Sequence, residues 1–181
     1  MLRVARPALV TALALLAAAP AAAQHPQTRQ GFWISGGASW GSLDLACDGC
    51  ETDRESGLTL LLAMGGTLRP GLLIGGELEG WGKEIGGVDI SVGHLSGVVY
   101  WYPRPASGLF LKGGGGIAVY SADAGPLGDE EDSGLGLHAG AGYDVRVGRN
   151  LSLTPAAGIF WGDLGAGDAN VIHLGVSITG H

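Results

Sequence analysis

Residues 107–120 read SGLFLKGGGGIAVY, and two kinds of position alternate along them. The odd positions, such as Leu109, Leu111 and Ile117, are apolar or glycine. The even positions include Lys112, the one charge, and small residues such as Ala118. A period of two indicates a β-strand with two different faces. A strand of about a dozen residues exceeds the usual ~5–6 of globular strands and suits a tilted strand that crosses a bilayer, ~9–11 residues.

The composition is that of one folded, strand-rich domain. The chain has 181 residues, of which 46% are hydrophobic, only 15% are charged and 35 are glycines. So few charges with so much apolar content argue against disorder, and the glycines favour closely approaching strands over a helical bundle. The formal net charge of −7 disfavours nucleic acid as a partner.

The first 23 residues predict a cleaved signal peptide. Arg3 and Arg6 form its positive end, residues 8–19 its apolar core, and Ala21 and Ala23 the small residues before the cut. Removing both arginines leaves 8 basic against 17 acidic residues, a net charge near −9. No later segment is apolar over ~18 residues, so we expect no membrane-spanning helix and one exported barrel domain over residues 24–181.

Period-two segments recur along the chain and predict eight strands. These cover residues 31–43, 58–69, 72–83, 88–102, 107–120, 134–147, 151–161 and 170–179. The fourth is ambiguous, because Ile90 and Val92 favour one face whereas Leu95 and Val99 favour the other. A β-bulge near Gly93 would reconcile the two phases.

The connections and the aromatic residues favour a membrane barrel. The second, fourth and sixth strands end in short turns, whereas long acidic segments, 44–56 and 121–133, follow the first and fifth. Short turns on one side and long loops on the other are typical of bacterial outer-membrane barrels. We expect aromatic belts at both interfaces. One belt would contain Phe32, Trp33, Tyr100, Trp101, Tyr102, Phe110 and Tyr143; the other would contain Trp40, Trp81, Tyr120 and Trp161.

Charges within the strands fall on the face opposite the large aliphatic residues. A soluble β-barrel, the alternative, would place apolar residues inside and charges outside. The sequence therefore predicts an all-β fold, an eight-stranded antiparallel up-and-down transmembrane β-barrel, with both termini on the periplasmic side.

Two paired stretches, YWYPRPASGLFLKGGGGIAVY at 100–120 and LGLHAGAGYDVRVGRNLSLTP at 135–155, carry a family resemblance. With the signal peptide and the eight alternating strands, they resemble the small eight-stranded outer-membrane barrels related to OmpA and OmpX. The resemblance covers residues 31–179. It implies a porin-like fold in the outer membrane of a Gram-negative-type bacterium, within the cell envelope.

Six charged residues lie on the predicted inner face: Arg69, Glu77, Glu79, Lys112, Asp144 and Arg146. Eight strands leave a lumen just wide enough for side chains, and unpaired buried charges are costly. We expect an interior charge network that plugs the lumen, with Lys112 paired to Glu77 or Glu79. A gated pore or a binding site is the alternative.

Cys47 and Cys50 lie in the first acidic loop. Export to an oxidising compartment favours a disulfide between them. A redox centre would need a nearby cation, whereas Asp48 and Glu51 are acidic, and a zinc site would need two further ligands. Free thiols are the remaining alternative.

His94 and Ser96 lie two residues apart on one strand, so both face the same way. Some outer-membrane lipid A deacylases use a His–Ser pair on a barrel strand, but no acid follows within a dozen residues to orient the histidine. His94, His138 and His173 occupy alternate strands, which are not neighbours, so we predict no metal site.

We therefore expect a non-catalytic barrel that serves envelope integrity or surface interaction through its acidic loops, residues 44–55 and 123–132. Neither loop has the ligand spacing of a calcium loop. Outer-membrane lipid and surface ligands are the expected partners of a monomer, with no catalytic residue, cofactor, metal or nucleic acid. A lipid-acting enzyme using His94 and Ser96, or a narrow channel, are the alternatives.

Overall fold

The computed structural model describes residues 29–46, 54–123, 125, 128–165 and 167–181. These residues form β1 Phe32–Ala46, β2 Glu55–Arg69, β3 Leu72–Ile85, β4 Val88–Trp101, β5 Leu109–Asp123, β6 Asp129–Tyr143, β7 Val145–Arg146, β8 Leu151–Asp163 and β9 Asp168–Gly180. Among them there is no helix with the length and apolar content needed to cross a membrane. The expected signal peptide and both cysteines lie outside the described residues.

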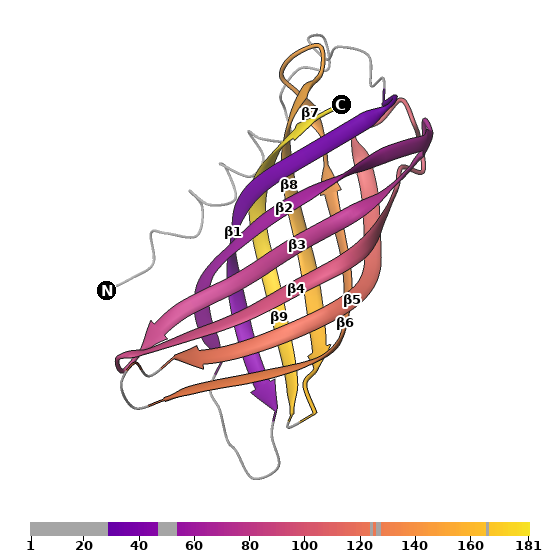
Figure 1. Ribbon diagram of the computed structural model, residues 1–181. Coiled ribbons are helices and arrows are strands. Elements are labelled where there is room, and N and C mark those ends of the chain that lie inside the picture. Colours follow the sequence, from indigo (N-terminus) through magenta and orange to yellow (C-terminus); the bar gives the residue numbers. More distant parts are fainter. Residues whose placement is uncertain (1–28, 47–53, 124, 126–127, 166) are drawn as a thin grey trace, which may run out of the picture.

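The strands close into a barrel (Figure 1). β1 to β6 pair antiparallel in chain order, and β8 pairs antiparallel with β6, β7 and β9. β1 pairs with β9 from Ile34↔Gly180 to Ala46↔Asp168, which closes the sheet. Closure satisfies the backbone hydrogen bonds that an open sheet edge would expose to lipid.

β6 and β7 are two parts of one barrel strand. The register against β8 is unbroken, since Gly142 pairs with Ala156 and Val145 pairs with Leu153. The interruption lies opposite Pro155, which has no N–H to donate. The nine segments thus make eight barrel strands, which confirms the predicted eight-stranded antiparallel barrel.

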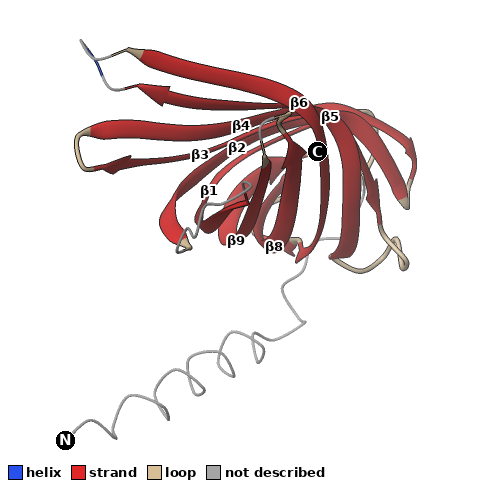
Figure 2. Ribbon diagram, turned by 90° about the horizontal axis from the view of Figure 1, so that it is seen from below, coloured by secondary structure: helices blue, strands red, loops and turns tan. Residues whose placement is uncertain are grey.

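The two ends of the barrel differ in their connections. At the turn end, short turns join β2 to β3 and β7 to β8, and the segment of residues 102–108 joins β4 to β5. At the loop end, strands run further than predicted: β5 pairs with β6 as far as Asp123↔Asp129, so much of the expected loop 121–133 is strand. β8 pairs with β6 only from Leu135 onward. Figure 2 shows hairpins that project beyond the barrel body on this side.

Large apolar side chains face outward along the strands, as the inside-out pattern predicts. The exposed set includes Leu58, Leu60, Leu62, Leu78, Leu95, Ile117, Leu135, Leu137, Leu174 and Ile178.

The expected bulge near Gly93 is wrong. β4 keeps one register with both neighbours through this position. Val92 is buried inside and Ile90 packs beside it, in phase with His94 and Ser96. Ile90 and Val92 are apolar although they face inward, because the lumen is itself lined by apolar side chains at this height.

The aromatic belts are correct only in part. Trp40, Trp101 and Trp161 point outward, as does Phe32. Five of the expected belt residues are instead buried in the lumen: Trp33, Trp81, Tyr100, Tyr102 and Phe110. The predicted belts rest only on the height of each residue along its strand. Side chains on the inner face cannot reach the lipid interface, whatever their height.

Candidate functional site in the barrel lumen

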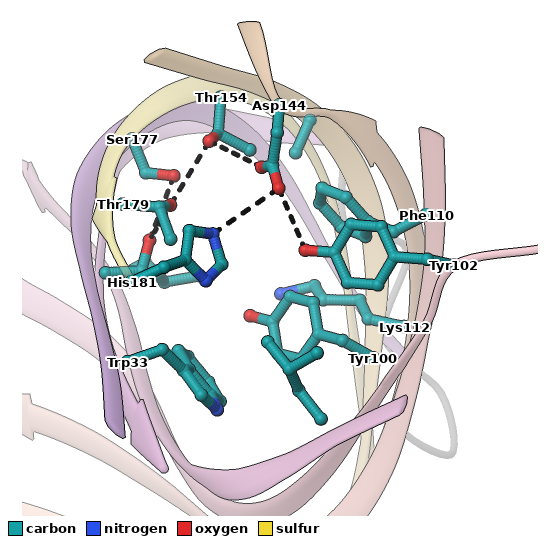
Figure 3. Close-up of a pocket in the computed structure, with 14 residues that line it drawn as sticks. Trp33, Tyr100, Tyr102, Phe110, Lys112, Asp144, Thr154, Ser177, Thr179 and His181 are labelled. Carbon is teal, nitrogen blue, oxygen red and sulfur yellow. Dashed lines mark hydrogen bonds and ion pairs between the residues drawn. The ribbon is translucent and has the colours of Figure 1, made fainter. Parts of the chain in front are cut away.

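Asp144, between β6 and β7, is the centre of a polar cluster at the turn end (Figure 3). Its carboxylate is 1% exposed and accepts hydrogen bonds from Tyr102 Oη at 3.0 Å and Thr154 Oγ1 at 2.9 Å. Arg29 Nη2 donates at 2.9 Å, and His181 Nε2 lies 3.6 Å away. We call these five residues the ionic cluster. A buried carboxylate with this many donors is well compensated.

Arg29 ties the segment before β1 across the turn end. Its guanidinium lies 3.5 Å above the centre of the Tyr102 ring. It also donates to the backbone carbonyls of Pro105 at 3.1 Å and Ser107 at 3.2 Å. Its side chain is wholly buried, so it closes much of the opening at this end.

The ionic cluster fixes the protonation state of Tyr102, which lies just beyond the end of β4. Burial, and then the charge of Asp144, raise the pKa of the Tyr102 phenol, which therefore remains a donor.

A second charged group lies deeper in the lumen, around Glu77. Lys112 Nζ contacts Glu77 Oε1 at 2.6 Å, so Lys112 has one of its two expected partners. Tyr100 donates to Glu77 Oε2 at 2.7 Å. Farther toward the loop end, Glu79 contacts His173. These side chains are almost fully buried, so each charge depends on its partner rather than on bulk water.

Of the six expected inward charges, Arg69 lies elsewhere. The pairing of β2 with β3 shifts by one residue between Thr67 and Arg69, which turns Arg69 out of the inward phase. Arg69 is exposed at the turn end. Arg146 is buried at the same end, where it donates weakly to the carbonyl of Arg149 at 3.5 Å.

His94 and Ser96 both face the lumen, but they do not form a catalytic pair. Ser96 Oγ contacts His138 Nδ1 at 3.3 Å instead of His94. Glu77 Oε1 approaches the same nitrogen, at 3.4 Å. In a catalytic triad the nucleophile and the acid bind opposite ring nitrogens. This geometry therefore does not support the lipid-acting enzyme.

His94 and His138 approach each other, contrary to the expectation from their alternate strands. Their ring centres are 5.2 Å apart. The intervening strand carries Gly114 and Gly116, and a side chain at Gly114 would meet His138. Within the described parts of the chain, no group of three His, Cys, Asp or Glu residues could hold a metal ion.

Toward the loop end the lumen is filled by apolar side chains, which we call the apolar layer. Its members are Leu43, Trp81, Val92, Ala118, Phe160, Leu164, Ala169 and Val171. On the other side of this layer lie two small cavities of about 30 and 40 Å³, both lined in part by Lys112 and Thr154. Cavities of this size hold a few waters at most. The arrangement is that of a filled barrel.

A family model described as outer membrane protein beta-barrel domain matches residues 9–179. The chain belongs to this outer-membrane β-barrel family. It is therefore an outer-membrane protein, and the expected resemblance to small outer-membrane barrels is confirmed. No curated protein matches the sequence.

Solved outer-membrane barrels share the fold at low sequence identity. The attachment invasion locus protein Ail of Yersinia pestis is 14% identical, with a TM-score of 0.63 over 84% of this chain and 99% of Ail. Neisserial surface protein A is also 14% identical, with a TM-score of 0.63 over 84% of this chain and 98% of that protein. Ail in complex with the heparin analogue sucrose octasulfate is 15% identical, with a TM-score of 0.57 over 84% of this chain and 99% of that chain.

Two features of this outer-membrane barrel were missed from the sequence. Arg29 lies in a short polar segment outside any strand, where no periodicity assigns a face. The apolar layer was missed because apolar residues on the inner face break the alternation of polar inward and apolar outward residues that a membrane barrel is expected to show. The one signal in the sequence was Asp144 itself, because a buried carboxylate near a turn needs hydrogen-bond donors and the sequence had not identified them.

Proposed function

We propose that this outer-membrane barrel is non-catalytic and acts through surface interactions of its loop end, which faces outward while both termini lie on the periplasmic side. The observation that carries the proposal is the filled lumen. The ionic cluster occupies one end and the apolar layer the other, so the accessible chemistry is on the rim. Neither a substrate path nor a nucleophile geometry is supported by the described residues.

The rim of the loop end is acidic. Its described acidic residues are Asp44, Glu55, Glu84, Asp89, Asp123, Glu130, Glu131, Asp132, Asp163 and Asp168. The basic residues there are Arg54, paired with Asp44 at 3.1 Å, and Lys83, paired with Glu55 at 2.6 Å. The excess negative charge favours cationic partners. Ail was solved with an anionic heparin analogue, and an acidic rim would repel such a ligand.

A narrow channel is the second candidate, and the buried charges and small cavities favour it. The apolar layer argues against it, because apolar constrictions exclude water and ions. A pore would require this layer to move.

Two further predictions belong to this proposal. Residues 1–23 are removed as a signal peptide, which intact-mass measurement of the purified protein would detect.

Cys47 and Cys50 form a disulfide, which a mass increase of about two daltons on reduction would reveal.

Adhesion of cells to charged beads tests the surface role. Cells expressing the protein should bind amine-coated beads more than cells without it. The substitutions Glu84→Gln, Asp89→Asn, Glu130→Gln and Asp168→Asn together should bring binding back toward the level of cells without the protein. Arg69→Gln with Arg104→Gln, exposed at the other end, is the matched control and should change nothing. Unchanged adhesion of the neutralised variant, at equal surface amounts of folded barrel, would refute the proposal.

A further inference from the structure

A hollow of about 190 Å³ lies at the loop end, beside the projecting part of β5 and β6. Its floor is apolar and is formed in part by Leu45, Tyr120 and Leu164. We call it the mouth pocket. A cavity of about 150 Å³ is known to accept benzene, so this volume suits one aromatic or branched apolar side chain.

The floor of the mouth pocket continues the apolar layer of the lumen. Leu164 is 4% exposed and belongs to that layer, while Leu45 and Tyr120 are partly buried and pack against it. Because the floor is supported from below by packed side chains, it is a fixed apolar surface that does not need to be formed on binding.

The sides of the mouth pocket carry carboxylates. Glu130 and Asp132 come from the projecting part of β6, and Asp168 is the first residue of β9. No basic side chain is among the described residues that line it. A bare metal ion would find an apolar floor in place of oxygen ligands, and a neutral apolar ligand would gain nothing from the negative charge beside it.

An occupant that matches both features has an apolar group next to positive charges. We propose that the mouth pocket binds cationic peptides, with one aromatic or branched apolar side chain on its floor and flanking Lys or Arg side chains against Glu130, Asp132 and Asp168. This inference rests on the proposed surface role and names the class of partner. Charge complementarity favours peptides over lipid A, whose phosphates the same carboxylates would repel.

Calorimetric titration of the folded barrel in zwitterionic nanodiscs tests the inference, with empty discs as the blank. The probe is the amidated peptide Lys-Trp-Lys, and the ligand controls are Lys-Gly-Lys and Glu-Trp-Glu. We expect saturable binding of Lys-Trp-Lys, with both controls weaker by about tenfold or more, because each lacks one of the two matched features. Equal affinity of Lys-Gly-Lys would overturn the proposal, since the apolar floor would then contribute nothing.

Two protein variants localise the site. Glu130→Gln with Asp168→Asn should weaken Lys-Trp-Lys binding about fivefold or more. The matched pair Glu84→Gln with Asp89→Asn removes the same charge from exposed, directly paired positions outside the pocket, and should have a much smaller effect. Ala46→Phe, at an exposed lining residue, should fill the pocket and abolish binding with every carboxylate retained. Equal losses in both neutralised pairs, or normal binding to Ala46→Phe, would contradict the inference.

Calcium distinguishes a peptide site from a cation site. Calcium chloride should weaken peptide binding no more than sodium chloride of the same ionic strength. Specific competition by calcium would overturn the inference in favour of a metal site. Failure of the proposed surface role would give a different result. Cell adhesion would then stay unchanged in the variant with four neutralised carboxylates, even though the pocket variants alter peptide binding.

Discussion

The turn-side half of the lumen combines buried ion pairs with apolar packing around Trp33 and Phe110, whereas the loop-side half is closed by apolar packing. Near the turns, Asp144 and Glu77 each lie among several donors at hydrogen-bonding distance. Near the loops, side chains such as Trp81 and Phe160 are buried in the apolar layer. Charges in the first half are costly when they lose a partner, while the second half tolerates exchange of one apolar side chain for another.

This contrast predicts that substitutions of similar size will have unequal effects on the two halves. In the turn-side half, a substitution lowers stability because it leaves a buried charge without its partner. In the loop-side half, it lowers stability because it removes packed volume. Both losses of stability are measured as the free energy of unfolding in lipid vesicles, by urea titration with heat-modifiable gel migration as the readout of the folded barrel.

The largest effect is expected for Lys112→Met, which preserves much of the side-chain volume and removes the charge. Glu77 would remain buried with Tyr100 as a donor but without the Lys112 cation, at a cost of about 3–5 kcal/mol. Adding Glu77→Gln to Lys112→Met should recover much of the loss. An unchanged urea midpoint for the single variant would refute the pairing of Lys112 with Glu77.

A smaller loss is expected for Arg29→Met. Asp144 would keep Tyr102, Thr154 and His181 as neighbours, so the cost should be about 1–3 kcal/mol. Arg104→Met, at an exposed turn residue, serves as the control and should leave stability unchanged. If both variants unfold at the same urea concentration as the wild type, Arg29 does not stabilise the turn end.

Phe160→Leu tests the apolar layer. It exchanges one apolar side chain for another of moderately smaller volume, so we expect a loss below about 1.5 kcal/mol. Phe160→Asn at the same position should cost clearly more, because its amide would be buried among apolar groups. Equal losses for the two variants would mean that this half of the lumen is hydrated.

Arg69→Gln should have the smallest effect, within about 0.5 kcal/mol, because Arg69 is exposed. A loss comparable to that of Lys112→Met would place Arg69 inside the barrel after all.

The fold could be predicted because lipid imposes the same demand on every strand. Leu78, Leu95 and Ile117 lie on three neighbouring strands, at the same height and on the same outward face. One pattern is thus repeated around the barrel and can be recognised strand by strand without knowing any contact.

The interior was harder to predict because its contacts cross the lumen. His94 meets His138 because Gly114 on β5 and Gly136 on β6 leave room for the two rings, and Arg69 leaves the lumen because of a single register shift. Arg29 contacts Asp144, which is 115 positions away in sequence. Such contacts depend on several strands at once, so no local period contains them.

Planar-bilayer conductance tests the central claim, a lumen filled at both ends, most directly. The purified, folded barrel should give no stable conductance steps under conditions in which an open porin gives them. Discrete steps of uniform size from the wild-type protein would contradict the filled lumen and favour the channel.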